Sequence, residues 1–200
     1  MKLSSARPYN LEVNERIIES AFRELIRAIG EDPDREGLAR TPERIADLYR
    51  HIFSGVGRDP KEVFKVYTVE NYDEMVILKD IDFFSVCEHH FLPFFGKAHI
   101  AYIPNEGRIT GATHLIEVLE VFSHRPTIQE RLTTDVADFL YNNLRPLGVL
   151  VVTEARHLCL EMTGKEKPGT KIVASAMRGY LRKPASRAEA LRLIGKLSME

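Results

Sequence analysis

The tetrapeptide Cys87-Glu88-His89-His90 places a thiol, a carboxylate and two imidazoles within four consecutive residues. Cys87 and His90 are three positions apart, so on a turn or a short helical segment they face the same side. The only other cysteine is Cys159, in the distant segment His157-Leu158-Cys159. If these cysteines and a histidine bind one metal ion, the fold must bring two remote segments together. A set of two cysteines and one histidine is typical of catalytic zinc sites.

The alternative is that both cysteines are small buried hydrophobic residues and that the histidines beside them are incidental. A single Cys-x-x-His pattern favours this alternative, and the wider sequence context reverses the balance. Two cysteines in 200 residues do not form a disulfide framework. No signal peptide and no apolar stretch of membrane-spanning length is evident. We therefore expect a cytoplasmic protein with reduced thiols that are free to bind metal, and no membrane partner.

The charge balance of the chain also limits the kinds of partner that it is expected to bind. Basic and acidic residues number 28 and 29, and no basic run stands out. Nucleic-acid binding usually requires a basic patch, so no nucleic-acid partner is expected. Hydrophobic residues make up 44% of the chain, which is enough for a substantial core.

Two helices are predicted in the N-terminal part of the chain. Asn14 can cap the first helix, whose apolar residues recur at helical spacing until Gly30 ends it. Thr41-Pro42 is typical of the start of the second helix. We expect residues 1–60 to form a helical arm and residues 61–200 to form the catalytic domain.

Alternating apolar residues predict four strands in two pairs, at residues 75–86, 95–103, 149–162 and 171–181. The short link between the first two strands predicts an antiparallel hairpin with the Cys-x-x-His pattern in its connection. Two helices are predicted between the pairs. The fold class is therefore α+β, with a four-stranded antiparallel sheet in the order ββααββ covered by helices. The edge strands of such a sheet are unpaired, and pairing them with neighbouring subunits would close a ring.

Several candidate site residues could instead have a purely structural role. Thr113 can cap the first of the two central helices, and Thr127 with Glu130 can form a capping box for the second. His157 and Cys159 are two positions apart, so in a continuous strand over 149–162 both side chains point to one face.

Ordered sequence blocks between about Arg40 and Leu193 carry a resemblance to a known family. The blocks are Thr41-Pro42-Glu43-Arg44, Cys87-Glu88-His89-His90, Gly96-Lys97-Ala98, Ala101-Tyr102-Ile103-Pro104, Arg125-Pro126, Gln129-Glu130-Arg131-Leu132-Thr133, Glu154-Ala155, His157, Cys159 and Lys167-Pro168-Gly169-Thr170. In this combination the chain resembles the GTP cyclohydrolase I family. The resemblance implies the tunnelling fold and a homo-oligomer, a toroidal decamer with active sites at subunit interfaces.

The resemblance also implies a zinc-dependent hydrolase that opens the imidazole ring of guanine. In the family, GTP is converted to 7,8-dihydroneopterin triphosphate and formate, which feeds folate and other pterins. The zinc (Zn²⁺) ligands implied for this chain are Cys87, His90 and Cys159. The matching catalytic residues are His157, an acid/base that protonates the ring, and His89, a second active-site histidine near the sugar and phosphate of the substrate.

Substrate-binding residues follow from the same resemblance. Glu130 matches the carboxylate that anchors guanine, and Gln129 supports it. Thr113 stands where the family has a serine near the ribose, and Arg44 matches an arginine that contacts phosphate. For Glu130 the capping box remains the competing interpretation.

The triphosphate subsite departs from the family pattern. The family presents a lysine, an arginine and a further arginine where this chain has His114, Glu117 and Thr163. Either the phosphate recognition has changed, or these are ordinary surface residues and other cations contact the phosphates. Arg108, Lys165 and Lys167 are candidates for such a replacement.

Four functions therefore compete. The first is GTP cyclohydrolase I activity, and the second is the same ring opening on a guanine substrate that lacks the usual triphosphate recognition. The third is a ring that binds ligands or partners without catalysis. The fourth is the nitrile reductase branch of the same fold, for which a Cys, His and Cys zinc pattern is not expected.

Overall fold

The computed structural model describes residues 14–163 and 167–196. The chain divides into two compact units, with the division between Arg58 and Asp59. The roles expected for residues 1–60 and 61–200, as arm and catalytic domain, stay predictions. Across the described ranges, no helix combines the length and the apolar character that a membrane span requires.

The first unit contains the two predicted helices, α1 (Glu15–Ala28) and α2 (Thr41–Ile52). As expected, the side chain of Asn14 caps α1 by accepting a hydrogen bond from the backbone N–H of Ile17 at 3.2 Å. The two helices pack through aromatic rings, because Phe22 meets Tyr49 edge to face with ring centroids 5.6 Å apart.

The second unit is built on a five-stranded sheet with the order β5-β2-β3-β6-β7. Its four long strands, β2 (Val76–Cys87), β3 (Pro93–Ile103), β6 (Gly148–His157) and β7 (Lys171–Gly179), pair antiparallel in sequence order. The hairpin of β2 and β3 confirms the predicted antiparallel pair. The fifth strand, β5 (Pro126–Thr127), runs parallel to β2.

The expectation of four purely antiparallel strands is therefore wrong by this short parallel strand. Pro126 and Thr127 pair with Val86 and Cys87 at the end of β2. A proline suits an edge strand because it has no N–H to leave unpaired. The strand matters for function because it fixes the chain beside Cys87.

The remaining elements of the second unit connect or cover this sheet. They are η1 (Pro60–Val63), β1 (Tyr67–Thr68), β4 (Arg108–Ile109), α3 (Ala112–Ser123), α4 (Gln129–Leu144), α5 (Leu158–Glu161), η2 (Tyr180–Arg182) and α6 (Pro184–Lys196). The strands β1 and β4 form a separate antiparallel pair.

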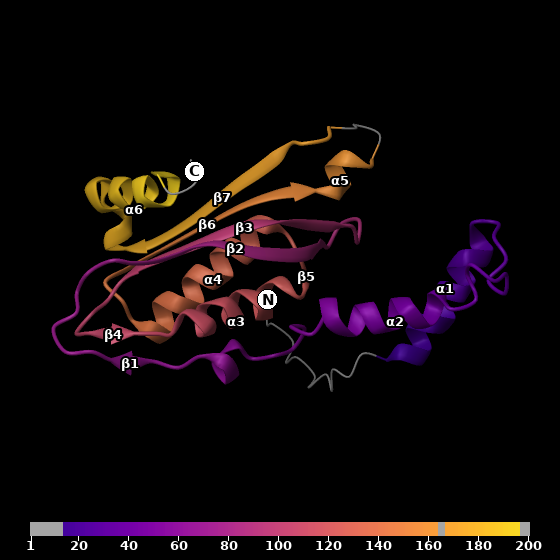
Figure 1. Ribbon diagram of the computed structural model, residues 1–200, viewed down its shortest axis with the longest axis horizontal. Helices are drawn as coiled ribbons and strands as arrows, with labels where there is room; N and C mark the ends of the chain where they lie inside the picture. The colour runs from indigo at the N-terminus through magenta and orange to yellow at the C-terminus, as the bar shows by residue number, and fades with distance from the viewer. Residues whose placement is uncertain (1–13, 164–166, 197–200) are drawn as a thin grey trace, which may run out of the picture. The chain divides into compact units, whose positions relative to one another are not determined.

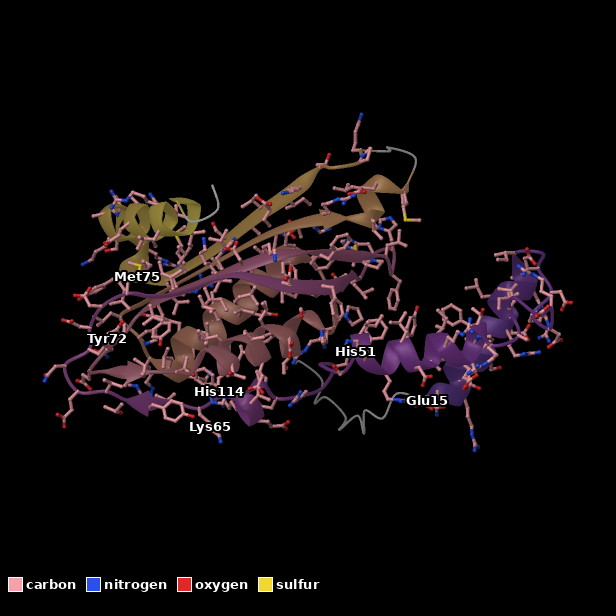
Figure 2. All side chains as sticks on the ribbon, in the orientation of Figure 1. Glu15, His51, Lys65, Tyr72, Met75 and His114 are labelled. Atoms are coloured by element: carbon pink, nitrogen blue, oxygen red, sulfur yellow. The ribbon has the colours of Figure 1, made fainter. Side chains whose placement is uncertain are left out.

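Helices cover both faces of the main sheet, to different extents (Figure 1). On one face α3 and α4 pack against inward-pointing strand residues, and the fully buried side chains there include Phe94, Ile100 and Leu132. On the other face α6 covers a smaller apolar cluster that includes Leu150 and Ile194. Met75, labelled in Figure 2, packs against this second cluster. Alternation of side chains along each strand supplies both layers.

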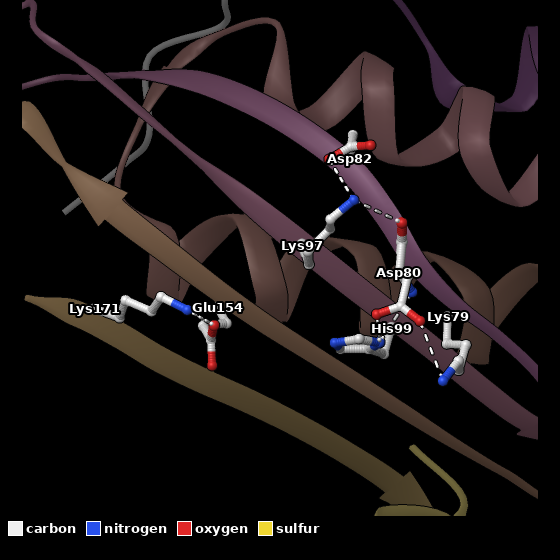
Figure 3. Close-up of polar contacts among 7 residues, drawn as sticks. All are labelled: Lys79, Asp80, Asp82, Lys97, His99, Glu154 and Lys171. Carbon is white, nitrogen blue, oxygen red and sulfur yellow. Dashed lines mark hydrogen bonds and ion pairs between the residues drawn. The ribbon is translucent and has the colours of Figure 1, made fainter. Parts of the chain in front are cut away.

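Several charged side chains lie on the same face as α6 and pair across neighbouring strands (Figure 3). The ammonium of Lys97 lies 2.6 Å from the carboxylate of Asp82, and that of Lys171 lies 2.7 Å from Glu154. These pairs are partly exposed, so their contribution to stability is small.

The strand predicted over residues 149–162 ends earlier than expected. β6 stops at His157, and Leu158–Glu161 form a single helical turn. His157 and Cys159 are therefore not neighbours on one strand face, and that expectation is wrong. The two side chains nevertheless line the same cavity, because the turn folds Cys159 back beside the strand end.

Both predicted helix caps in the central segment are also wrong. α3 starts at Ala112 with Gly111 in the cap position, so Thr113 lies inside the first turn. α4 starts at Gln129 with Ile128 in the cap position and no side-chain cap, so Thr127 and Glu130 form no capping box. The extended pairing of Thr127 with Cys87 holds it outside the helix.

Candidate metal centre and adjoining pocket

Sheet topology brings the two cysteine-containing segments together. β2 and β6 both pair antiparallel with β3, so they run in the same direction and end at the same edge of the sheet. Cys87 is the last residue of β2, and Cys159 lies in α5 directly after β6. The two remote segments therefore come close together, because only β3 lies between β2 and β6 in the sheet.

Cys87, His90 and Cys159 form a cluster that could hold a metal ion. One ligand atom from each residue lies within 4.8 Å of the others. Cys87 is buried, Cys159 is half-buried and His90 is exposed. Two sulfur atoms and one imidazole nitrogen suit zinc, and three protein ligands are the number typical of catalytic zinc sites.

The turn after β2 holds Cys87 and His90 on one side. The N–H of Cys87 donates to the carbonyl of Leu92 at 2.9 Å, and the N–H of Phe91 donates to the carbonyl of Cys87 at 2.8 Å. Phe91 has a φ of 53°, a left-handed conformation that closes the turn tightly. The three-residue spacing therefore places Cys87 and His90 in one cluster that could hold a metal ion.

A bidentate arginine–carboxylate pair secures each half of the cluster. Arg131 of α4 donates to both oxygens of Glu88, at 2.5 and 3.1 Å, next to Cys87. Arg156 of β6 donates to both oxygens of Glu161, at 2.9 and 2.7 Å, across the turn that contains Cys159. The hydrogen bond from Arg131 holds the pKa of Glu88 below its ordinary value. Paired geometry of this kind orients its elements more strictly than a single contact.

A pocket of about 280 Å³ adjoins the cluster. It brings together six of the residues predicted from the sequence, drawn from β2, α4, β6 and their connections. Its lining residues are Cys87, His89, Phe94, Thr127, Ile128, Gln129, Glu130, His157, Cys159, Leu160 and Ile172. Mostly apolar walls with a few convergent polar groups are typical of small-molecule sites.

His157 lies in this pocket with its ring held in place. It is 7% exposed, and its ring stacks on Phe94 with the centroids 4.7 Å apart and the planes 2° from parallel. Its Nε2 lies 2.7 Å from Oε1 of Gln129. Burial lowers the pKa of His157, and the nearby carboxylate of Glu130 partly opposes that shift.

Gln129 and Glu130 are neighbours in the chain but have opposite environments. Gln129 is fully buried, and its amide nitrogen donates to backbone and side-chain oxygens of β6 and β7. Glu130 is exposed in the first turn of α4, lines the pocket, and receives no hydrogen bond at its carboxylate from any described residue. With the capping box absent, the carboxylate of Glu130 is available to a ligand.

The other predicted substrate residues do not join the pocket within one chain. Thr113 and His114 lie in the first turn of α3, which starts near β4 and ends next to β5 (Figure 1). His114 and Ser123 are nine positions apart, which corresponds to about 14 Å along the helix. Arg44 belongs to α2 of the first unit.

His114 and Glu117 interact with each other and with β1. Nδ1 of His114 lies 3.2 Å from Oε2 of Glu117, and its Nε2 lies 3.3 Å from the hydroxyl of Tyr67. The rings of His114 and Tyr67 also stack, with centroids 6.2 Å apart. His114 is labelled in Figure 2.

The remaining residues named for the phosphate subsite have their own local contacts. The hydroxyl of Thr163 donates to the carbonyl of Cys159, one helical turn earlier. Nε of Arg108 donates to the carbonyl of Leu144 at 2.9 Å, which satisfies the end of α4. Lys167 is exposed, whereas Lys165 lies outside the described residues.

Sequence reasoning missed the residues that support the pocket from behind. Phe94 is the direct cross-strand partner of His157, and Thr153 and Ile172 accept hydrogen bonds from Gln129. The register of β3 against β6 would have revealed the Phe94 pair, but no local pattern specifies that register.

Comparison with known proteins gives a consistent picture. The family model described as GTP cyclohydrolase I matches residues 18–195. The GTP cyclohydrolase 1 of Carboxydothermus hydrogenoformans is 51% identical over 187 residues, 93% of this chain and 97% of that protein. Those of Clostridioides difficile and Bacillus subtilis are 52% and 50% identical, over 92% and 90% of this chain and 97% and 95% of theirs.

Among solved structures, the archaeosine synthase QueF-Like in its apo form is 21% identical and covers 52% of this chain and 93% of its own. Its TM-score of 0.39 is too low to bear on the fold. With a family model that spans most of its length and relatives that share half of its residues, this chain belongs to the GTP cyclohydrolase I family.

Proposed function

We propose that this protein opens the imidazole ring of guanine by zinc-dependent hydrolysis, as a GTP cyclohydrolase I, converting GTP to 7,8-dihydroneopterin triphosphate and formate. The observation that carries the proposal is the Cys87, His90 and Cys159 cluster beside a pocket that also contains His157 and Glu130. Membership in the GTP cyclohydrolase I family supports the reaction type.

The donor atoms of the cluster fit zinc better than the other common divalent ions. Thiolate and imidazole ligands select zinc, whereas magnesium and calcium take oxygen ligands. Cys87, His90 and Cys159 would hold the ion. When bound, zinc lowers the pKa of a water molecule towards neutrality and so makes a nucleophile available for C8 of guanine.

In this proposal His157 moves the proton that activates the ring. Guanine C8 is a poor electrophile until N7 is protonated, and a histidine can donate that proton near neutral pH. His157 lines the same pocket as two of the metal-cluster residues, which supports this role. His89, also in the pocket, would contact the sugar or phosphate of the substrate.

Glu130 would anchor the pyrimidine edge of guanine. Its two carboxylate oxygens can accept from N1–H and from the 2-amino group in parallel. Its position at the first turn of α4, facing the pocket, supports this role. A site built to accept both donors strongly rejects purines that lack the 2-amino group, because the carboxylate is then left unpaired.

We further propose the tunnelling fold for the second unit, and a homo-oligomer, specifically a decamer with interfacial active sites. Two observations support an interfacial site. β7 is the outermost strand of the main sheet, with an edge that another subunit could pair with. Thr113 and His114 also lie far from the pocket within one chain. Light scattering on the zinc-loaded protein should give the mass of ten subunits, and a monomer at micromolar concentration would contradict both assembly and a shared site.

The contacts of His114 favour one second candidate, a ring-opening enzyme whose guanine substrate carries fewer phosphates. His114 and Glu117 are already paired, and Thr163 bonds within its own turn. None of the three offers a free positive charge to a triphosphate. The same chemistry at the metal cluster would then act on a different nucleotide.

One experiment separates these candidates. The zinc-loaded protein is incubated with GTP, GDP, GMP and guanosine, and formate release and pterin fluorescence are followed for each. A strong preference for GTP supports the first candidate, and similar rates across the four support the second. Release of formate from none of them would overturn both and would point to a ring that binds without catalysis.

A further inference from the structure

We infer that Gln129 is a positioning residue that holds the ring of His157 as the tautomer protonated on Nε2 and so leaves Nδ1 as the ring nitrogen available to the substrate. The inference deepens the proposed function, since it rests on His157 acting in the reaction. It assigns to Gln129 a role different from the substrate contact predicted by the family resemblance.

The orientation of the Gln129 amide follows from its neighbours. Its nitrogen lies 3.0 Å from the carbonyl oxygens of Thr153 and Ile172, and 3.0 Å from the hydroxyl oxygen of Thr153. Carbonyl oxygens only accept hydrogen bonds, so the NH₂ group must face them. The opposite orientation would bury the amide oxygen against two carbonyl oxygens, which is unfavourable for a side chain with no exposure.

A closed set of hydrogen bonds among three side chains strengthens this assignment. The hydroxyl of Thr133 donates to the backbone carbonyl of Gln129 at 2.7 Å. Its oxygen lies 2.8 Å from the hydroxyl of Thr153, so Thr153 must donate in that contact. The oxygen of Thr153 can then only accept from the amide of Gln129. The two hydrogens of the Gln129 amide are shared among three acceptors, and both threonines are buried.

The amide oxygen of Gln129 therefore faces His157 and determines its protonation pattern. Oε1 lies 2.7 Å from Nε2 of His157 and can only accept, so Nε2 must carry a proton. The stacking of the ring on Phe94 prevents it from tilting out of this contact. In the neutral ring the remaining lone pair is on Nδ1.

This arrangement leaves one nitrogen of the ring for the substrate. Nδ1 has no hydrogen-bond partner among the described residues, whereas the Nε2 proton is held in the hydrogen bond to Gln129. In hydrolases that use a carboxylate at the equivalent place, the partner both fixes the tautomer and stabilises the imidazolium. The neutral amide of Gln129 fixes the tautomer without adding a negative charge.

The tautomer can be measured directly in the zinc-loaded protein without altering Gln129. Solid-state ¹⁵N NMR of protein with labelled histidine, recorded at mildly alkaline pH, distinguishes protonated from unprotonated ring nitrogens. The variant His157→Gln assigns the signals. We expect Nε2 of His157 to carry the proton and Nδ1 to be bare. A proton on Nδ1 would overturn the inference.

A pair of adjacent variants tests the consequence for catalysis. Gln129→Met keeps the length of the side chain but cannot accept from Nε2, so His157 should populate both tautomers. We expect kcat to fall by roughly 10–100-fold, as for other lost partners behind functional histidines, with KM and zinc content almost unchanged. The matched control Glu130→Gln should raise KM and leave the His157 tautomer unchanged. Thr133→Val, which breaks the hydrogen-bonded set farther away, should shift the tautomer less than Gln129→Met.

The outcomes separate this inference from the proposed function. If the parent releases formate but Gln129→Met keeps the parental tautomer and kcat, the inference fails and the function stands. If the parent turns over none of the four guanine substrates, the function fails while the NMR result still decides the tautomer. If Gln129→Met does not fold, the parental spectrum and Thr133→Val decide the question.

Discussion

The two ends of the second unit treat polar side chains in opposite ways. At the pocket, Cys87, His90 and Cys159 converge, and Glu130 has no hydrogen bond from the described residues. At the start of α3, His114 bonds to both Glu117 and Tyr67. A carboxylate that only water satisfies can exchange that water for a ligand donor, whereas groups already paired within the chain must give up a partner. The first end is therefore prepared to bind, and the second is already satisfied within the chain.

The binding free energy lost at the second end can be estimated if the family's phosphate contacts apply there. A hydrogen bond to a charged group contributes roughly 1.5–3 kcal/mol. The absence of three cationic contacts, at His114, Glu117 and Thr163, would then cost about 5–9 kcal/mol, or about three to six decades of affinity. Base and metal recognition would be unaffected. The predictions that follow test each end separately, starting with the largest effect.

Removal of one thiol should abolish metal binding and activity at the pocket end of the unit. In Cys159→Ala we expect loss of bound zinc and of all formate release, because two ligands rarely retain zinc where three are required. Metal analysis after dialysis measures the zinc content. The control Thr163→Ala removes only the hydroxyl that bonds to the carbonyl of Cys159 and should keep the metal. If Cys159→Ala binds zinc as tightly as the parent, the ligand assignment is wrong.

Removal of His157 should leave the metal but slow the reaction. The variant His157→Asn should retain zinc and fold, and should lose roughly 10²–10⁴-fold in rate, the usual contribution of a general acid or base. Steady-state kinetics with the preferred substrate and metal analysis of the same sample give both values. Full activity in this variant would exclude His157 from the mechanism. Catalysis at the pocket would then depend on the metal without His157.

Restoring positive charge at the start of α3 should increase the affinity for the triphosphate of GTP. The combined variant His114→Lys, Glu117→Arg and Thr163→Arg should tighten GTP binding at least about tenfold, or about 1.4 kcal/mol, with little change for GMP. The gain should shrink at high salt because the new contacts are ionic. Glu120→Arg, also on α3 and exposed, is the control for a general charge effect. If the parent already binds GTP at low micromolar concentration and rejects GMP, other cations form the phosphate site.

The smallest effect concerns His99, a buried histidine that does not line the pocket. It accepts from the backbone N–H of Asp80 at 3.1 Å, on the sheet face shown in Figure 3. Burial lowers the pKa of His99, Asp80 and Glu154 oppose the shift, and Lys79 and Lys97 add to it.

The sign of the resulting pH dependence follows from the lowered pKa. The unfolded chain protonates His99 more readily than the folded chain, so stability falls as pH drops through the ordinary histidine value of about 6.5. The variant His99→Gln should show a shallower loss of thermal stability between mildly alkaline and mildly acidic pH. An identical loss in variant and parent would mean that His99 is not held neutral by burial.

Local patterns predicted the parts of the molecule that depend on neighbours in sequence. The cap of α1 by Asn14, the antiparallel hairpin of β2 and β3 and the Cys87-x-x-His90 half of the metal cluster follow from spacing within a few residues. Hydrophobic periodicity, capping and turn chemistry act over that range, so one sequence can reveal them. The pocket residues His89, Gln129 and Glu130 were instead expected from the family resemblance, and their roles stay predictions.

Only the tertiary structure decided what depends on contacts between remote segments. The end of β6 at His157, the parallel pairing of β5 and the start of α4 outside a capping box all contradict local expectation. Each is set by packing against a strand distant in the sequence, where burial outweighs local propensity. For the same reason the local pattern did not reveal that Gln129 is buried against His157, and its predicted substrate contact stays a prediction. The sequence by itself determined which chemistry this protein carries, and long-range packing decided how its atoms are held.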